Sequence, residues 1–262
     1  MSDSTEYNVR AVERALQILK YFDDKHPERG VSEISEVVGL HKATTHRILA
    51  TLVNYGFIER TADGLKYRLG VQLVDLGFKV SRRMDLRREA MPIMTRLALK
   101  INEAVDLSIW NQSSVLYIEM IQSQHALTVS ATPGQRLPGY CTASGKVFLS
   151  HLSEEELNKY LSTSLDATTK NTVTSIGALR SELHNVREQG YAVDNEEFEY
   201  GVRAVAAPVY DLQDQVIGAV SVPGPANRLT PERIQEIIPH LLDTTKEISK
   251  CMGWSKIHNF RN

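Results

Sequence analysis

The segment VSEISEVVGLHKATTHR, residues 31–47, is the most informative stretch of this chain, because it predicts two short helices separated by a tight turn. In its first part, apolar residues recur at helical spacing at Val31, Ile34, Val37 and Val38. Ser32 is a good N-cap for that helix, and Gly39 stands where the helix must end and the chain must turn. Two helices joined in this way indicate a helix-turn-helix, which favours a gene regulator.

The second helix is expected to begin near Lys42 and to present its first turns to DNA. Those turns carry side chains of the types that contact bases and phosphates: Lys42, Thr44, Thr45, His46 and Arg47. Behind them, an apolar stripe holds the helix against its domain and consists of Ile48, Leu49, Leu52 and Val53. The alternative is an ordinary exposed helix, on which the charges are solvated, one threonine caps or faces solvent, and His46 packs on the surface.

The flanking segments complete a winged helix-turn-helix. Residues 11–24 place apolar side chains on one helical face, and the following HPERG breaks that helix. Arg10, just ahead of this helix, is expected in a mobile terminus rather than against phosphate. After the second helix, FIERTADGLKYRLG (residues 57–70) predicts a hairpin with its turn at Asp63-Gly64. Its cations Arg60, Lys66 and Arg68 suit phosphate contacts, although such cations are also common on hairpins that never meet DNA.

Length and composition set the class of protein. The chain has 262 residues, of which 42% are hydrophobic, so two domains with real cores are expected. No apolar run approaches the roughly 18 residues of a membrane span, and the N-terminus lacks a signal-peptide segment, so we expect no membrane partner and a cytoplasmic location. Cys141 and Cys251 match no metal-ligand spacing, and we expect no metal site, disulfide or cofactor. Net charge is about +3 up to Arg88 and about −5 beyond it, which weakly favours phosphate binding by the first part.

The rest of the chain predicts a second domain. A linker helix is expected at 71–81, followed by an exposed charged connection, SRRMDLRRE, and a long helix from Asp85 toward Ile101. We therefore expect a DNA-binding domain at 1–70, a linker at 71–84 and a second domain at 85–262. The segments that read as strands are 105–110, 115–121, 126–131, 191–194, 202–210 and 215–222, with a loop at 132–140.

Helices are expected around 146–151, 153–161 and 176–189, with a closing helix from Pro231 that Thr230 caps. Strand runs in sequence, with helices before and after them, indicate an α+β domain around an antiparallel sheet.

Three segments carry a resemblance to a known family over nearly the whole chain: GLHKATTHRILATLVNYGFIER, YCTASGKVFLSHL, and YAVDNEEFEYGVRAVAAPVYD running on to VIGAVSVPGP. In this order and spacing, the chain resembles the IclR family of bacterial transcriptional regulators. The resemblance implies a winged helix-turn-helix that binds double-stranded operator DNA, a linker helix, and a GAF-like α/β effector-binding domain with an antiparallel sheet. It also implies a homodimer or a dimer of dimers, whose operator binding changes when a small organic acid or aromatic catabolite binds.

The resemblance also implies an effector site. Ala143 and Ser144 would offer backbone N–H groups, Gly145 gives the backbone room to turn, Asp194 would line the cavity, and Ser221 would donate from its hydroxyl.

Two positions in the expected effector site depart from the small-carboxylate type of the family. Ala204 replaces a cysteine and Pro223 replaces a second serine, which predicts a larger or less polar effector. Its neighbours are expected among the aromatic residues Trp110 and Tyr140 and the thioether Met120. The alternative is that the two changes repack a pocket of unchanged chemistry.

An enzyme is the second hypothesis, with the helix-turn-helix serving only for dimerisation. Its acidic cluster would be Asp194, Glu196, Glu197 and Glu199. No histidine or cysteine stands nearby in sequence to complete a ligand set, and carboxylates in such a turn are usually solvated, so no catalytic residue is assigned. The sequence Ser144-Gly145-Lys146 lacks the preceding glycine of a phosphate-binding loop, and Cys141 is expected to be a packed small residue.

Overall fold

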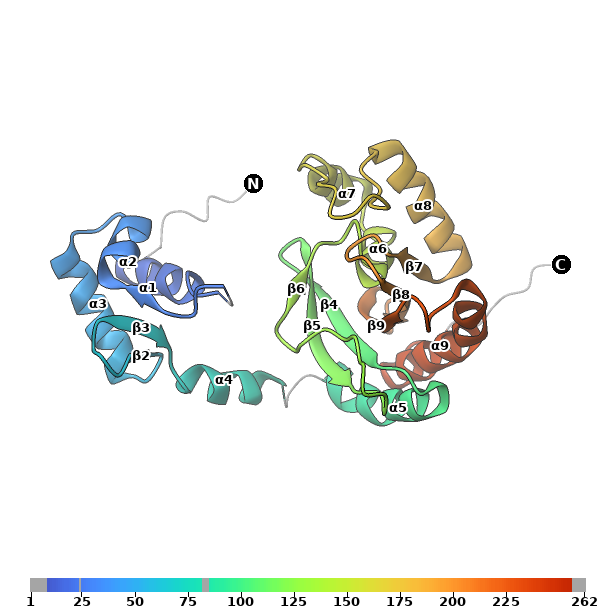
Figure 1. Ribbon diagram of the computed structural model, residues 1–262, viewed down its shortest axis with the longest axis horizontal. Coiled ribbons are helices and arrows are strands. Elements are labelled where there is room, and N and C mark those ends of the chain that lie inside the picture. Colours follow the sequence, from blue (N-terminus) through green and yellow to red (C-terminus); the bar gives the residue numbers. More distant parts are fainter. Residues whose placement is uncertain (1–8, 24, 82–84, 256–262) are drawn as a thin grey trace. The chain divides into compact units, whose positions relative to one another are not determined.

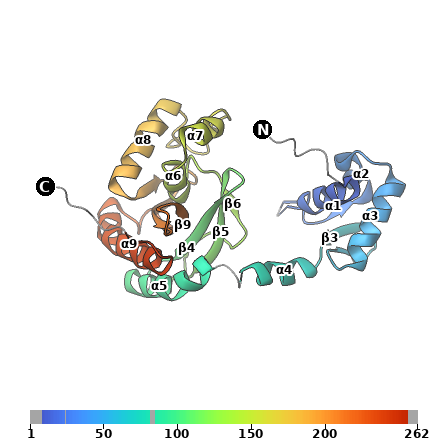
Figure 2. The ribbon, with the colours of Figure 1, turned by 180° about the vertical axis from the view of Figure 1, so that it is seen from behind.

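The computed structural model describes residues 9–23, 25–81 and 85–255, and the chain forms two compact units, Met1–Arg83 and Met84–Asn262. Figure 1 shows the elements of each unit, and Figure 2 shows them from behind. Both units combine helices with antiparallel strands, so the predicted α+β class is confirmed. Within the described ranges, no helix is long and apolar enough to cross a membrane. Of the exposed connection expected at 81–89, residues 82–84 lie outside the described residues, whereas residues 85–89 form the first turn of a helix, which corrects that part of the expectation.

The first unit is a winged helix-turn-helix followed by one further helix. Its elements are α1 (Arg10–Lys20), β1 (Arg29–Gly30), α2 (Val31–Val38), α3 (Lys42–Asn54), β2 (Ile58–Arg60), β3 (Lys66–Leu69) and α4 (Gln72–Ser81). The strands pair antiparallel in the order β1-β3-β2. The predicted hairpin is confirmed, with Gly64 in the left-handed region at φ 71°. The two-residue strand β1 falls in the segment that the sequence marked only as a helix breaker.

Local chemistry explains how the two central helices meet. Gly39 adopts φ 63°, ψ 41° after α2, a left-handed cap that a side chain would strain, and its N–H donates back to Glu36 O. The next helix, α3, therefore starts three residues later in a new direction. Its inner face packs on α1 and α2 through a core of fully buried residues: Ile18, Ile34 and Leu49.

The second unit is built on one six-stranded antiparallel sheet in the order β6-β5-β4-β9-β8-β7. Its strands are β4 (Val105–Asn111), β5 (Ser114–Ile121), β6 (Arg136–Leu137), β7 (Ala192–Asn195), β8 (Val202–Tyr210) and β9 (Val216–Pro225). Its helices are α5 (Asp85–Ile101), α6 (Ala143–Leu149), α7 (Glu154–Leu161), α8 (Ile176–Gln189) and α9 (Pro231–Cys251). The Thr230 side chain accepts from Arg233 N–H, which confirms the predicted cap of α9.

Helices cover both faces of this sheet, α5 and α9 on one side and α6 to α8 on the other (Figures 1 and 2). In β8, Val205, Ala207 and Val209 pack into the core formed with α5 and α9. The alternate residues Ala204 and Ala206 pack toward α6. Successive side chains of a strand point to opposite faces, so each central strand serves two separate cores.

One predicted strand is wrong. Residues 126–131 (ALTVSA) form irregular chain between β5 and β6. Their polar groups bond to nearby chain and side chains instead of a neighbouring strand, since Thr128 Oγ1 donates to His125 O at 3.0 Å and Ala131 N–H donates to Asp106 Oδ2 at 3.1 Å. Leu127 is exposed. Val129, Ser130 and Ala131 of this run line a cavity instead of extending the sheet.

Candidate functional site

The first half of α3 offers a polar surface to solvent. Its exposed polar side chains are Lys42, Thr44, His46 and Arg47. Thr45 is fully buried, and its hydroxyl donates to His41 O at 3.3 Å. The predicted DNA contact by Thr45 is therefore wrong, because the helical turn that exposes its neighbours points this side chain into the domain.

Helix α1 adds cations to the same surface. Arg10 and Arg14 line a shallow groove together with Thr44 and Arg47 of α3. Arg10 is the first residue of α1 rather than part of a mobile terminus, which corrects the expectation from its position in the sequence. The sequence did not single out Arg14, whose spacing of four from Arg10 on one helix is the signal that identifies it.

The hairpin of strands β2 and β3 is the wing of this domain, and one of its cations is free to contact DNA. Lys66 is exposed on β3, and no ion pair to it is found in the described part of the chain. Arg68 instead pairs with Glu59 at 3.0 Å, and the Arg60 guanidinium lies 5.5 Å from the centre of the Tyr67 ring.

The second unit encloses a cavity of about 100 Å³ between its sheet and α6. Of the seven residues predicted for the effector site, six line it: Ala143, Ser144, Asp194, Ala204, Ser221 and Pro223. Gly145 does not. A Cβ on Gly145 would lie 2.2 Å from the carbonyl oxygen of Gly139, so this glycine permits the close approach that seats the start of α6.

Strand register explains how these distant residues meet. Asp194 on β7 pairs with Ala204 on β8, which pairs with Pro223 on β9. Ser221 lies two residues before Pro223 on β9, on the same face of the sheet, and it pairs with Asp106 on β4. Because side chains repeat every two residues on a face, both rows face the cavity.

At the cavity wall opposite the sheet rows, the Thr142 side chain caps α6 by accepting from Gly145 N–H. This cap leaves the N–H groups of Ala143 and Ser144 without helical partners, as at any helix start.

Sequence reasoning missed three important cavity residues: Asp106, Tyr117 and Phe198. The signal for the first was an acidic residue inside the apolar strand run VDLSIW. Tyr117 and Phe198 are the aromatic lining.

The neighbours expected from the sequence, the aromatic Trp110 and Tyr140 together with Met120, are wrong, because none of them lines the cavity. Trp110 packs on Phe148 with ring centres 5.8 Å apart, the Tyr140 hydroxyl donates to Asp166 O at 2.8 Å, and the Met120 sulfur accepts from Ser130.

Burial dominates the electrostatics of the cavity. It raises the pKa of Asp106 to about 8, against the opposing effect of the Ala131 N–H, and the pKa of Asp194 to about 7, against that of the Glu197 N–H. Burial also raises the pKa of the Tyr117 phenol. Among the described residues that line the cavity there is no lysine, arginine or histidine. The cavity thus contains buried carboxyl groups without a balancing cation.

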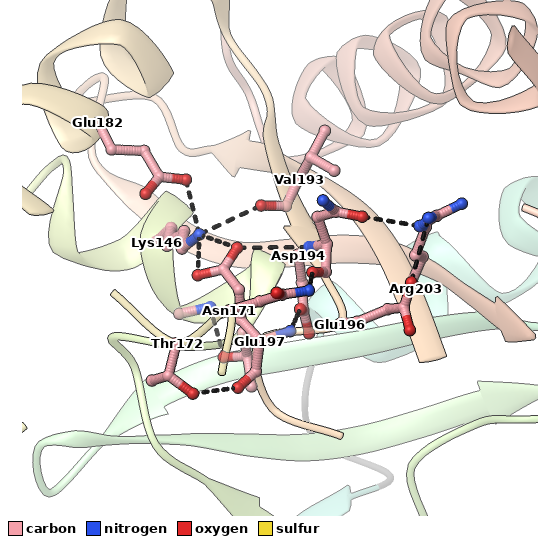
Figure 3. A network of polar contacts seen from close by, with 12 residues as sticks. Lys146, Asn171, Thr172, Glu182, Val193, Asp194, Glu196, Glu197 and Arg203 are labelled. Carbon is pink, nitrogen blue, oxygen red and sulfur yellow. Dashed lines mark hydrogen bonds and ion pairs between the residues drawn. The ribbon is translucent and has the colours of Figure 1, made fainter. Parts of the chain in front are cut away.

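The acidic cluster is split among different roles (Figure 3). Glu197 is buried, and both its carboxylate oxygens accept from Lys146 Nζ at 2.6 Å. Lys146 is itself fully buried and also donates to Glu182 at 2.6 Å. The expectation that these carboxylates are solvated is therefore wrong for Asp194 and Glu197. Glu196 pairs with Arg203 at 3.1 Å, whereas Glu199 is exposed at the cavity edge.

The same network links the cavity to α8. Asp194 Oδ1 accepts from Glu197 N–H at 2.8 Å, and Lys146 Nζ also donates to Val193 O at 3.3 Å. Lys146 is therefore a buried ion-pair partner and has no access to a bound phosphate. Cys141, next to α6, is buried, and burial raises the pKa of its thiol to about 12, so it is a packed residue as predicted.

Comparisons with known proteins agree with this architecture. Residues 11–62 match the IclR helix-turn-helix domain, and residues 78–250 match the model described as "Bacterial transcriptional regulator IclR C-terminal". The HTH-type transcriptional regulator XynR of Escherichia coli is 37% identical, covering 94% of this chain and 98% of that relative. KdgR of the same organism is 34% identical and covers 96% of each chain.

Solved structures give the same result. A regulator from Alicyclobacillus acidocaldarius has TM-score 0.83 and 27% identity, covering 94% of this chain and all of that one. An IclR homologue from Microbacterium hydrocarbonoxydans, crystallised with 4-hydroxybenzoate, has TM-score 0.81 and 27% identity, with the same coverage.

A winged helix-turn-helix in one chain with a cavity-bearing domain of this kind defines a DNA-binding transcriptional regulator rather than an enzyme. The chain belongs to the IclR family of bacterial transcriptional regulators.

Proposed function

We propose that α3 enters the major groove of a pseudo-palindromic operator and that its exposed residues Lys42, Thr44, His46 and Arg47 contact the DNA. The observation that carries this proposal is the gathering of these side chains on the solvent face of α3, while the neighbouring residues hold the helix in the core. Lys66 on the wing contacts a neighbouring phosphate. Thr45 is left out because it is buried.

The cavity of the second unit is the proposed effector site. Its volume of about 100 Å³ is small beside the roughly 300 Å³ at which drug-sized pockets begin, which favours a small organic acid or a single-ring catabolite. Ala204 and Pro223 make the sheet wall less polar, and Tyr117 and Phe198 add aromatic surface. This lining supports an aromatic acid, and a relative crystallised with 4-hydroxybenzoate is consistent with that class.

The proposed cavity contacts are divided between α6 and the sheet. The backbone N–H groups of Ala143 and Ser144 donate to the acid, Asp194 and Ser221 supply polar contacts from the sheet, and Gly145 seats α6.

The proposed mechanism is linkage between the two sites in a homodimer or dimer of dimers, with no bound cofactor. An effector that prefers one arrangement of the protomers shifts how well two copies of α3 match their half-sites. Exposed apolar side chains on α1 and α4, such as Leu16 and Val74, support self-association. Operator binding places the protein with the DNA, in the cytoplasm of a bacterium.

The test is a salt titration of binding to DNA from upstream of the protein's own gene, with a scrambled duplex as control. Arg47→Ala is expected to abolish sequence-specific binding and to reduce the salt slope by about 1 for each phosphate that the arginine neutralises in the wild-type complex. Arg180→Ala removes an equal charge from the second unit, where Arg180 pairs with Glu154, and should leave binding unchanged. Equal binding to both duplexes, indifferent to Arg47→Ala, would refute the proposal.

A further inference from the structure

Asp106 is a buried carboxyl group that the proposed function leaves without a role. It lies in β4, its side chain is almost completely buried, and it lines the cavity beside Ser144 and Ser221. Oδ2 accepts from Ala131 N–H at 3.1 Å. Oδ1 has no hydrogen-bond partner in the part of the chain that the structure describes, whereas the Ser144 hydroxyl interacts with the Tyr117 phenol. A buried polar atom without a hydrogen-bond partner indicates that a bound ligand supplies that partner.

The surroundings determine the charge that Asp106 carries. The titratable groups that share its cavity are Tyr117 on β5, Asp194 on β7 and Glu199 after it, and none of these is a cation. Ser144 of α6 and Ser221 of β9 are neutral. The buried cation Lys146 is held by Glu197 and Glu182. An ionised carboxylate is strongly disfavoured in such a place, whereas the neutral acid gains an O–H donor.

We propose that Asp106 binds the carboxylate of an anionic effector as a neutral carboxylic acid, donating from Oδ1, and that it keeps or takes up one proton from solvent when the effector binds. This inference rests on the proposed effector site and deepens it. The hydroxyls of Ser144 and Tyr117 belong to the same cavity, so the anion is bound by hydroxyl and carboxylic-acid donors in place of a basic side chain.

Asp194 does not take this role. Its Oδ1 accepts from Glu197 N–H, and, unlike Asp106, it has no buried oxygen without a hydrogen-bond partner among the described residues. The oxygen Oδ1 of Asp106 has no donor to stabilise a negative charge, and burial raises the pKa of the carboxyl to about 8, so both observations favour the neutral acid. Proton linkage then requires tight binding below that pH and weaker binding above it.

The experiment is calorimetric titration of the full-length protein with benzoate, 4-hydroxybenzoate and pyruvate between about pH 6 and about pH 9, with benzamide as the uncharged analogue. The Kd of the acid that binds is expected to begin to rise near pH 7, where the neighbouring Asp194 ionises and repels an anion, and to rise by a further factor of up to ten per pH unit above about pH 8, where Asp106 loses its proton. Repeating the titration in buffers of different ionisation enthalpy measures the proton taken up directly.

Two variants separate this role from a structural one. Asp106→Asn keeps a donor of the same shape, so it should bind the acid and lose the steeper rise in Kd above about pH 8, while the smaller rise from Asp194 remains. Asp194→Asn is the matched control and should keep the steeper rise, because Asp106 remains. Thermal unfolding checks that both variants fold.

Binding of an acid with a Kd that is independent of pH in the wild-type protein would overturn the inference and leave the effector site standing. Tighter binding as the pH rises would also overturn the inference, because it would show that the ionised Asp106 accepts a hydrogen bond from the effector. Failure of all three acids to bind at any pH would overturn the proposed effector class and this inference together.

Discussion

Replacing Lys146 with methionine should destabilise the second unit strongly. The ammonium group is fully buried, and it contacts both oxygens of Glu197 and one oxygen of Glu182, each at 2.6 Å (Figure 3). Glu197 is also buried, and burial raises the pKa of its carboxyl while Lys146 opposes that rise. Removing the lysine therefore leaves an uncompensated carboxylate in the interior.

The expected loss follows from this geometry. Removing one partner of a buried ion pair costs about 3–5 kcal/mol, whereas an exposed pair contributes about 0–1 kcal/mol. Glu182 keeps about a third of its side-chain surface exposed, so Glu182→Gln is the matched control with the smaller effect. In a domain of this size, a loss of 3–5 kcal/mol lowers the melting temperature by about 6–20 °C.

Differential scanning calorimetry of the full chain measures the transition of the second unit directly. The double variant Lys146→Met/Glu197→Leu should recover much of the lost stability, because neither the ammonium nor the carboxylate then remains buried without its partner. A single Lys146→Met variant that melts within about 2 °C of the wild type would refute the reasoning, as would equal losses in Lys146→Met and Glu182→Gln.

Three further results are expected. Gly145→Ala should unfold or severely destabilise the second unit, because its Cβ would overlap a backbone oxygen at 2.2 Å, while Gly177→Ala in the open part of α8 should be neutral or stabilising by up to about 1 kcal/mol; urea titration compares them. The folded protein holds a proton on Asp106 that the unfolded chain loses near its ordinary pKa of 3.8, so the unfolding free energy should fall by up to about 1.4 kcal/mol per pH unit between about pH 4 and about pH 8, and less in Asp106→Asn. In operator titrations, Thr44→Ala should weaken binding several-fold and Thr45→Val should not, because Thr45 is buried; the reverse order would show that α3 meets DNA through another face.

Local sequence signals predicted much of the architecture. Helix periodicity and Gly39 predicted α2, α3 and the long helices, and α8 has the predicted bounds Ile176–Gln189. The predicted N-cap Ser32 is wrong, because α2 begins at Val31 and its N-cap is Gly30. The turn at Asp63-Gly64 predicted the hairpin. Each of these signals lies within a few residues of the structure it specifies, which is why periodicity and turn chemistry suffice.

Predictions failed where several segments compete for the same partner. The run at 126–131 has the composition of a strand, but β6 takes the edge of β5 and Asp106 takes the N–H of Ala131. In α3, periodicity placed an apolar stripe correctly, yet it did not reveal that Thr45 belongs to the buried face. Neither outcome is decided by the segment alone, because both depend on which neighbour packs against it.

Local sequence patterns predicted the two-part organisation and the helix α3, and the family resemblance identified six residues that line the cavity. Only the tertiary structure decided that Asp106 joins Asp194 at that cavity and that Lys146 is buried between Glu197 and Glu182. These groups are brought together by strand register and helix packing across long stretches of chain. Register and packing are properties of paired elements, so no single stretch of sequence encodes them.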